Sequence, residues 1–220
     1  MARAADRARR DPSSVRLVAI SKTFPAEAVR DAAAAGQIDF GENRLQEALP
    51  KIEQTADLPL RWHLVGHLQS NKAKKAGERF DLIHSVDSAD LLSRIDESAA
   101  ALGRRVDLLV QVDLALEPTK HGAREDDVPA LFGAARGLRA ARLVGLMLLP
   151  PAVADPEDAR PYFRRLRDVR QRLLESGADP AMLAELSMGM SHDFEVAVEE
   201  GATMVRVGSA IFGSRPPVKG

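Results

Sequence analysis

A lysine stands at the end of an apolar run near the start of the chain. The run 17–20 reads LVAI, Ser21, Lys22 and Thr23 follow it, and Pro25 begins an alanine-rich segment with helical spacing. An ammonium group at the inner end of a buried strand loses hydration, so Lys22 either reaches water or has a task that needs a lowered pKa. The sequence has only seven lysines among its 31 basic residues, and an amine that can lose its proton is what arginine cannot supply. We therefore interpret Lys22 as a lysine that can form an imine.

Small residues gather in two segments near the end of the chain, LSMGMSHD and VRVGSAIFG. The residues concerned are Gly189, Ser191, Gly208 and Ser209. They let backbone N–H groups approach an anion, and each segment can begin a helix whose positive end points inward. An imine lysine facing a phosphate cradle describes a pyridoxal 5′-phosphate site, and it equally describes a Schiff-base aldolase acting on a sugar phosphate. The alternative that these glycines only turn the chain also stays open at this point.

The elements that must position these residues alternate between short β-branched runs and longer amphipathic stretches. Eight runs are expected to be strands: 15–21, 38–42, 61–66, 81–86, 106–113, 143–149, 184–188 and 203–208. Alternating strands and helices predict a parallel sheet, either closed as a (β/α)₈ TIM barrel or open and doubly wound. No Gly-x-Gly-x-x-Gly follows the first run, which favours the barrel. We predict one barrel domain over residues 1–220, with polar residues grouped where the strands end.

Composition narrows the class of protein. With 31 basic and 32 acidic residues the formal net charge is -1, which gives no electrostatic reason to expect nucleic acid or an anionic membrane as a partner. There is no cysteine, no run approaches the roughly 18 apolar residues of a membrane span, and the arginine-rich start leads into no apolar signal segment. The five histidines lack metal-ligand spacing. We expect a cytoplasmic protein without a metal site.

Several segments, in order from about residue 15 to residue 213, resemble the pyridoxal phosphate homeostasis proteins, which are single-barrel relatives of the alanine racemase N-terminal domain. The segments that carry the resemblance are AISKTFP (19–25), FGENRLQEA (40–48), WHLVGHLQSNK (62–72), HSVDS (84–88), EPTKHG (117–122), GLM (145–147) and LSMGMSHDFEVAVEEGATMVRVGSAIFG (186–213). The last is long enough to be highly specific. The resemblance implies a (β/α)₈ barrel that holds pyridoxal phosphate, without the second β-domain of the racemases.

The same resemblance implies a role for two groups of residues around the cofactor. Lys22 corresponds to the imine lysine. Ser191, with the backbone of Gly208 and Ser209, corresponds to the phosphate site. Ser209 stands where the family often has threonine, which keeps the hydroxyl.

Three further positions follow from the resemblance. Arg206 would face the pyridine nitrogen, and Asn43 and Met188 would lie close to the cofactor. A guanidinium cannot accept a proton, so it favours a neutral ring, which makes transamination and decarboxylation less favourable than a carboxylate partner would.

The expected function is cofactor binding rather than catalysis. Racemisation needs an acid/base group on each face of the α-carbon, and in the related racemases the second is a tyrosine supplied with the second domain. The single tyrosine here, Tyr162, lies in ARPYFRRL, a predicted helix on the barrel exterior. We expect a monomer that buffers pyridoxal phosphate or delivers it to pyridoxal phosphate-dependent apo-enzymes. The alternatives are a weak amino-acid racemase using the same site and a Schiff-base aldolase.

Overall fold

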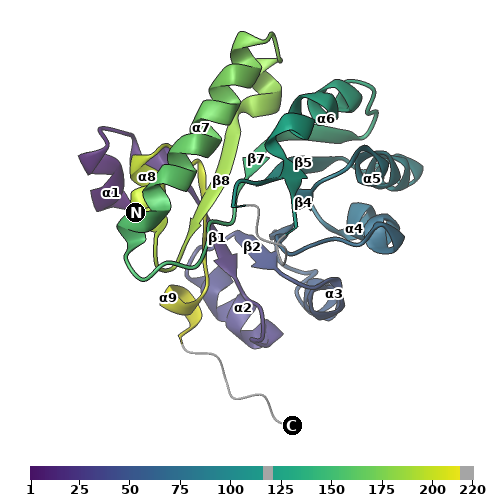
Figure 1. Cartoon of the computed structure of the whole chain (residues 1–220). Helices are drawn as coiled ribbons and strands as arrows, with labels where there is room; N and C mark the ends of the chain where they lie inside the picture. The colour runs from purple at the N-terminus through teal and green to yellow at the C-terminus, as the bar shows by residue number, and fades with distance from the viewer. Residues whose placement is uncertain (116–120, 214–220) are drawn as a thin grey trace.

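The computed structural model describes residues 1–115 and 121–213, and at its centre lies a closed parallel barrel (Figure 1). Each strand pairs in parallel with the next in the order β1–β2–β3–β4–β5–β7–β8–β9, and β9 pairs with β1 to close the ring. The barrel strands are β1 (Arg16–Ile20), β2 (Asp39–Glu42), β3 (Arg61–Leu64), β4 (Leu82–Val86), β5 (Val106–Asp113), β7 (Ala141–Met147), β8 (Glu185–Met190) and β9 (Met204–Val207). The prediction of a (β/α)₈ barrel is confirmed.

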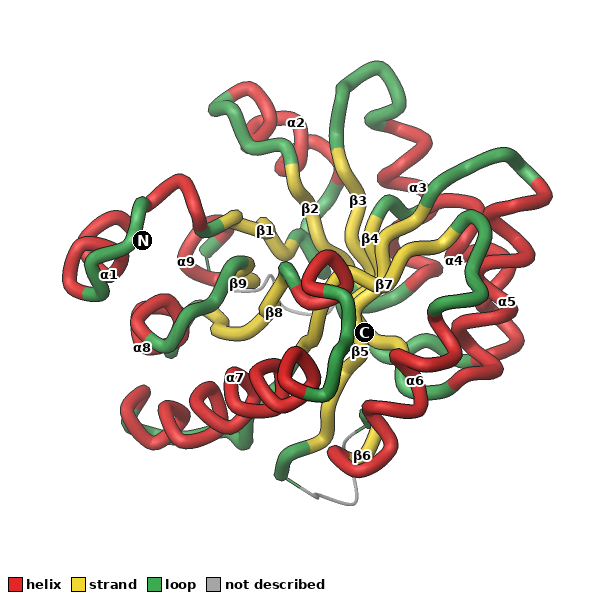
Figure 2. Tube along the Cα trace, turned by 90° about the horizontal axis from the view of Figure 1, so that it is seen from above, coloured by secondary structure: helices red, strands yellow, loops and turns green. Residues whose placement is uncertain are grey.

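Helices lie around the outside of the strands, as the view in Figure 2 shows. They are α1 (Ala2–Arg7), α2 (Ala26–Ala34), α3 (Leu45–Gln54), α4 (Ala73–Arg79), α5 (Ala89–Ala101), α6 (Val128–Ala135), α7 (Arg160–Glu175), α8 (Phe194–Glu199) and α9 (Ser209–Phe212). A parallel strand needs a crossover to reach its neighbour, and the helices from α2 to α8 supply these crossovers. Both faces of every strand are therefore covered, which explains why the strands read as nearly continuous apolar runs.

Alternation along each strand separates two apolar cores. Val18 and Ile20 point into the barrel, where they pack with Val65, Leu109 and Met204. Alternate strand residues, such as Ala19 between Val18 and Ile20, point outward. They belong to a much larger core between the sheet and the helices. The barrel interior is thus filled by side chains, which leaves the ends of the strands as the place for a ligand.

Most strand boundaries differ from the predicted ones by one or two residues, and β7 and β8 show why. β8 runs two residues past the predicted end, to Met190, and its pairing with β9 is irregular where Gly189 has φ +93°. β7 starts two residues before the predicted run, at Ala141, whose N–H donates to the carboxylate of Asp96 on α5 (2.8 Å). A two-residue strand, β6 (Ala123–Arg124), pairs with β5 outside the ring and was not predicted. The predicted segment 117–122 lies mostly outside the described residues.

The N-terminal helix is attached to the last part of the barrel. Arg7 of α1 donates to the carboxylates of Glu195 (2.6 Å) and Glu199 (2.7 Å) on α8, and Arg10 donates to the carbonyl of Val198 (2.8 Å). Figure 1 shows α1 and α8 beside each other. These charge-assisted hydrogen bonds hold α1 against α8, the helix that follows Ser191.

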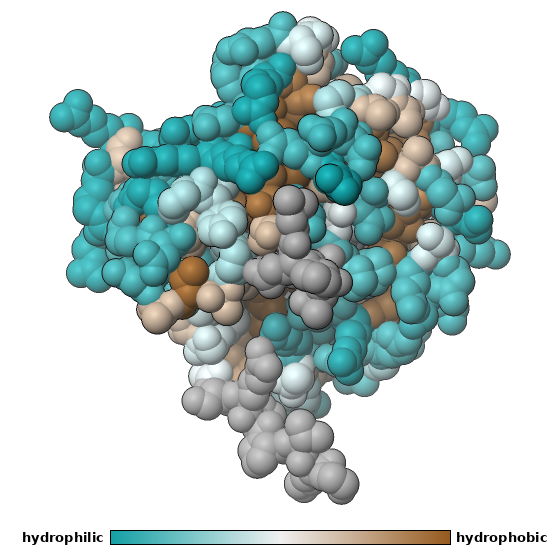
Figure 3. Space-filling model, in the orientation of Figure 1, coloured by the Kyte–Doolittle hydropathy of each residue, from teal (hydrophilic) through white to brown (hydrophobic). Residues whose placement is uncertain are grey.

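The outer surface carries mostly hydrophilic residues on the face seen in Figure 3, with small hydrophobic areas between them. Within the described ranges, no helix is both long enough and apolar enough to span a bilayer.

Candidate functional site

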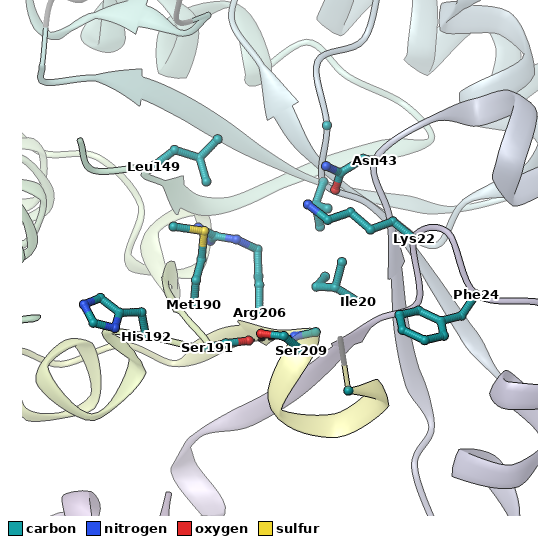
Figure 4. Close-up of a pocket in the computed structure, with 14 residues that line it drawn as sticks. Ile20, Lys22, Phe24, Asn43, Leu149, Met190, Ser191, His192, Arg206 and Ser209 are labelled. Atoms are coloured by element: carbon teal, nitrogen blue, oxygen red, sulfur yellow. Dashed lines mark hydrogen bonds between the residues drawn. The ribbon is translucent and has the colours of Figure 1, made fainter. Parts of the chain in front are cut away.

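A cavity of about 460 Å³ lies at the ends of the strands, within the size range typical of small-molecule sites. It is lined by residues at or just after the ends of β1, β2, β3, β7, β8 and β9. Six of the seven residues proposed from the sequence line it together: Lys22, Asn43, Ser191, Arg206, Gly208 and Ser209 (Figure 4). Segments that are up to 187 positions apart in the chain therefore meet in one pocket.

Lys22 lies in a tight turn directly after β1. The N–H of Phe24 donates to the carbonyl of Ser21 (3.1 Å), and Thr23 between them has φ +69°. A positive φ is unfavourable for a β-branched residue and costs on the order of 1–3 kcal/mol, which is a kind of strain that recurs at functional sites. The turn carries the chain away from the sheet, and Figure 4 shows Lys22 extending into the pocket beside Asn43.

A buried ion pair lies beneath this turn. Lys51 of α3 donates to the Glu42 carboxylate (2.5 Å) and to the carbonyl of Ser21 (2.7 Å), and the Ser21 hydroxyl donates to the same carboxylate oxygen (2.6 Å). Burial raises the pKa of Glu42, and the hydrogen bonds from Lys51 and Ser21 oppose that effect. The cluster joins α3, β1 and β2 directly under Lys22. Sequence reasoning assigned no role to Lys51 because nothing in its neighbourhood shows that it points inward.

Arg206 forms part of the pocket lining from within the barrel. Its side chain is buried, and its Nη1 and Nη2 groups donate to the Ser187 hydroxyl (2.6 Å) and the Leu148 carbonyl (2.8 Å). Burial lowers the pKa of Arg206 to about 10, with the Asp193 carboxylate acting in the opposite sense. The guanidinium is therefore cationic at neutral pH and held at two points.

The loops after β8 and β9 are joined by a hydrogen bond. The N–H of Gly208 donates to the Ser191 hydroxyl (3.1 Å), and a Cβ at position 208 would lie 3.2 Å from the Ile20 carbonyl oxygen. Ser191 and Ser209 both line this edge of the pocket, as Figure 4 shows. Two hydroxyls, an amine and a buried guanidinium form a set of hydrogen-bond donors that suits an anionic ligand, and the amine can form an imine with a carbonyl group.

Met188 is the one predicted residue that does not line the pocket. It is fully buried in the outer core, whereas Ser187 beside it points into the barrel. The irregular backbone at Gly189 then brings Met190 to the pocket instead. Two methionines flank Gly189 in SMGM. Met188 points outward because it alternates with Ser187, whereas Met190 follows the positive φ of the glycine and lines the pocket.

Other lining residues were not singled out from the sequence. Phe24 packs against Phe212 of α9 with ring centroids 5.3 Å apart, and Leu149 adds an apolar wall. His192 donates to the carbonyl of Ala154 (3.0 Å), and Figure 4 shows its ring turned away from Lys22. In the sequence, only their positions could have indicated that they reach the pocket, because Phe24 follows SKT and His192 lies within SHD.

Few side chains at the pocket can exchange a proton. Among the described lining residues, the basic groups are Lys22, His192 and Arg206, and there is no carboxylate. Tyr162 lies on α7, partly buried against the outer core. The arrangement can bind an anion and form a covalent bond through an amine, and it offers few acid/base groups.

Comparison with known proteins places this geometry in a class. The family model of the alanine racemase N-terminal domain matches residues 2–216, so the chain is one of the barrels of that class. A pyridoxal phosphate homeostasis protein of Aquifex aeolicus is 43% identical over 213 residues, covering 97% of this chain and 92% of its own. One of Pseudomonas aeruginosa is 46% identical over 212 residues, covering 96% and 90%. The chain belongs to the family of pyridoxal phosphate homeostasis proteins.

Solved structures agree with this assignment. PipY of Synechococcus elongatus with PLP bound is 45% identical, with a TM-score of 0.85 over 96% of this chain and 99% of that one. An alanine racemase of Clostridium difficile has a TM-score of 0.77 at 16% identity, over 99% of this chain and 56% of the racemase. The racemase shares the fold, and this chain spans about half of its length.

Proposed function

We propose that this protein is a pyridoxal phosphate-binding barrel that buffers the cofactor or delivers it to other proteins, with Lys22 as the covalent attachment point. The observation that carries the proposal is the meeting of Lys22, Arg206 and the Ser191–Gly208 pair around one cavity. The presence of PLP in a relative that is 45% identical over nearly the whole chain adds support. The domain would extend over residues 1–220.

Each part of the ligand has a matching group in the pocket. When bound, pyridoxal phosphate supplies an aldehyde that condenses reversibly with a primary amine and releases water. Lys22 presents the amine, and the hydroxyls of Ser191 and Ser209 lie where a phosphate group would be held. Arg206 keeps a guanidinium within the barrel, where it can donate to a ring nitrogen but cannot accept a proton from it.

The same groups favour binding over turnover. A partner that does not accept a proton leaves the pyridine nitrogen neutral, and a neutral ring withdraws electrons weakly. Besides Lys22 and Arg206, the only basic side chain among the described lining residues is His192, whose ring donates to the Ala154 carbonyl. Racemisation needs two positioned acid/base groups, each worth roughly 10²–10⁴-fold, so trace activity at most is expected.

Reduction with borohydride tests the attachment point. In the wild-type protein, we expect a stable adduct in the peptide that contains Lys22. Lys22→Ala and Lys22→Arg should give no adduct, and the second keeps the positive charge. Lys72→Ala removes a lysine that does not line the pocket and should give the wild-type result. An adduct at Lys72, Lys74 or Lys75 in the wild-type protein would refute the assignment.

A pair of assays separates a carrier from an enzyme. The protein loaded with pyridoxal phosphate is incubated with L-amino acids in deuterated water, and α-proton exchange and chirality are followed. In parallel it is mixed with a pyridoxal phosphate-dependent apo-enzyme whose activity reports transfer. Recovery of that enzyme with negligible exchange supports the carrier, whereas exchange at about 1 s⁻¹ or faster would support a racemase. His192→Gln shows whether residual exchange depends on that ring.

The remaining predictions concern assembly and partners. We propose a monomer whose partners are pyridoxal phosphate and pyridoxal phosphate-dependent apo-enzymes, working in the cytoplasm. Sedimentation equilibrium should give the mass of one chain, with and without the cofactor.

A further inference from the structure

A chain of polar side chains runs through the barrel interior, starting at the pocket. Arg206 Nη1 lies 2.6 Å from Ser187 Oγ, which lies 2.8 Å from His84 Nδ1. His84 Nε2 lies 2.9 Å from His63 Nδ1, and His63 Nε2 lies 3.0 Å from a carboxylate oxygen of Asp39. Ser187, His84 and His63 are fully buried. Asp39 is the first residue of β2, so the chain connects the pocket with the opposite end of the barrel.

The two ends of this chain fix the direction of every hydrogen bond in it. A guanidinium only donates, so Ser187 Oγ accepts from Arg206 and has its own proton left for His84 Nδ1. His84 must then carry its proton on Nε2 and donate it to His63 Nδ1. His63 in turn carries its proton on Nε2 and donates to Asp39, which as a carboxylate only accepts. The bonds follow one another without a conflict when both histidines are neutral.

The charges around the histidines agree with this arrangement. Burial lowers the pKa of both histidines, and the positive charges of Arg206, Arg16 and Arg61 act in the same sense. The carboxylate of Asp39 opposes the effect at His63. A cation at one end and an anion at the other therefore enclose two uncharged rings.

We propose that Ser187, His84, His63 and Asp39 are positioning residues that hold the Arg206 guanidinium in one orientation at the cofactor pocket. The Leu148 carbonyl fixes Nη2, and the Ser187 hydroxyl fixes Nη1. Ser187 accepts from Arg206 through a lone pair because its own O–H donates to His84 Nδ1, and His63 and Asp39 hold His84 in the Nε2–H tautomer. The role toward the cofactor rests on the proposed function, while the chain of hydrogen bonds does not.

Nitrogen-15 NMR of the histidine rings in the ligand-free protein tests the chain directly. We expect His63 and His84, assigned with His63→Gln and His84→Gln variants, to be neutral Nε2–H tautomers throughout about pH 6–8. His67, which is partly exposed, provides a ring outside the chain for comparison. An Nδ1–H tautomer at either position, or a ring that becomes protonated within this range, would overturn the proposed direction.

Cofactor binding tests the consequence for Arg206. Ser187→Ala removes the acceptor of Nη1 and should raise the Kd for pyridoxal phosphate about fivefold or more, with a shift in the absorption maximum of the bound cofactor. The matched control is Ser85→Ala, since among the described residues the buried Ser85 hydroxyl has no hydrogen-bond partner. Its Kd should stay within about twofold of the wild-type value. Equal Kd values and spectra for Ser187→Ala and wild type would refute the positioning role.

Asp39 offers a test far from the pocket. Asp39→Ala removes the last acceptor and should weaken binding in the same direction as Ser187→Ala. Asp39→Asn keeps an amide oxygen that can accept from His63 and should restore most of the affinity. An Asp39→Ala protein that is folded by circular dichroism and binds as tightly as the wild type contradicts the proposal. If the wild type itself fails to bind pyridoxal phosphate, the proposed function fails. The histidine tautomers measured by NMR would still show whether the chain of hydrogen bonds from Arg206 to Asp39 exists.

Discussion

Short side chains shape the pocket as much as charged ones do. Ser191 accepts a hydrogen bond from the Gly208 backbone and lines the same edge of the pocket as Ser209. Arg206 and Lys22 line other sides of the same cavity. The small residues at the loops after β8 and β9 are therefore expected to set where the phosphate group of a ligand binds.

Replacing Ser191 tests this at single-residue resolution. Ser191→Ala should weaken pyridoxal phosphate binding by about 1–2 kcal/mol, because one charge-assisted hydrogen bond is lost. That corresponds to roughly a 5- to 30-fold higher Kd in a fluorescence titration. Gly208→Val should also weaken binding, because even a Cβ there lies 3.2 Å from the Ile20 carbonyl oxygen. Ser93→Ala, at an exposed position on α5, is the control, and unchanged affinity in both pocket variants would contradict the placement.

Which residues reach the pocket could be predicted where a strand end is followed by a polar or small residue. Lys22, Ser191 and Gly208 come directly after apolar runs, so the barrel rule places them at the mouth. Met188 could not be placed in this way, because a single sequence does not specify which of Ser187 and Met188 points into the barrel. The meeting of His63 with His84 depends on the register between β3 and β4, which a single sequence does not specify.

At the scale of secondary-structure elements, a few buried polar contacts set how strands and helices join. The order of eight strands followed from the alternation of the sequence, since apolar runs and amphipathic stretches differ in period. The start of β7 did not, because it depends on Asp96 of α5 accepting backbone N–H groups from Arg139, Ala140 and Ala141. Long-range contacts of this kind leave no local pattern, so boundaries shift by a few residues.

The Lys51–Glu42 pair gives a prediction at this scale. Lys51→Met leaves a buried carboxylate without its cation, and breaking a buried pair costs roughly 3–5 kcal/mol of the free energy of unfolding. The double variant Lys51→Met/Glu42→Gln removes both charges and should recover most of that loss. Urea unfolding measures both. The exposed Arg94–Asp90 pair on α5 is the comparison, and Arg94→Met should change the free energy by about 0.5 kcal/mol or less.

The outcome for the single and double variants discriminates between two roles. A small loss in the single variant would show that the pair contributes little and that Glu42 accommodates the missing cation by taking up a proton. Large, equal losses in both would show that packing around α3, rather than charge, is what the lysine provides.

For the whole molecule, closing the barrel buries polar side chains in its centre, where His63, His84 and Ser187 are fully buried. Val18, Ile20 and their neighbours fill the inner core, and a polar path through it runs from Arg206 to Asp39. The repeat predicted eight parallel strands, and the absence of Gly-x-Gly-x-x-Gly favoured their closure. The polar path could not be predicted, because it is formed by residues from β2, β3, β4, β8 and β9 together. Its chemistry gives the molecule a dependence on pH.

Unfolding should become easier as the pH falls below about 6.5. His63 and His84 have lowered pKa values in the folded protein, so the unfolded chain binds more protons than the folded one once the pH is below the ordinary histidine value of about 6.5. Stability is therefore fully present above that value and is lost as the pH falls toward the folded pKa, at about 1.4 kcal/mol per pH unit for each histidine that stays neutral.

Urea unfolding at pH 5, 6 and 7.5 measures this effect when the wild type is compared with the double variant His63→Gln/His84→Gln. The variant should be less stable at pH 7.5, because its hydrogen bonds are disturbed, and its stability should fall less steeply toward pH 5. Glu42 has a raised pKa and acts in the opposite direction, but it is present in both proteins, so it cancels in the difference between the two slopes. Parallel slopes for the two proteins would mean that the buried histidines take up protons without unfolding the barrel.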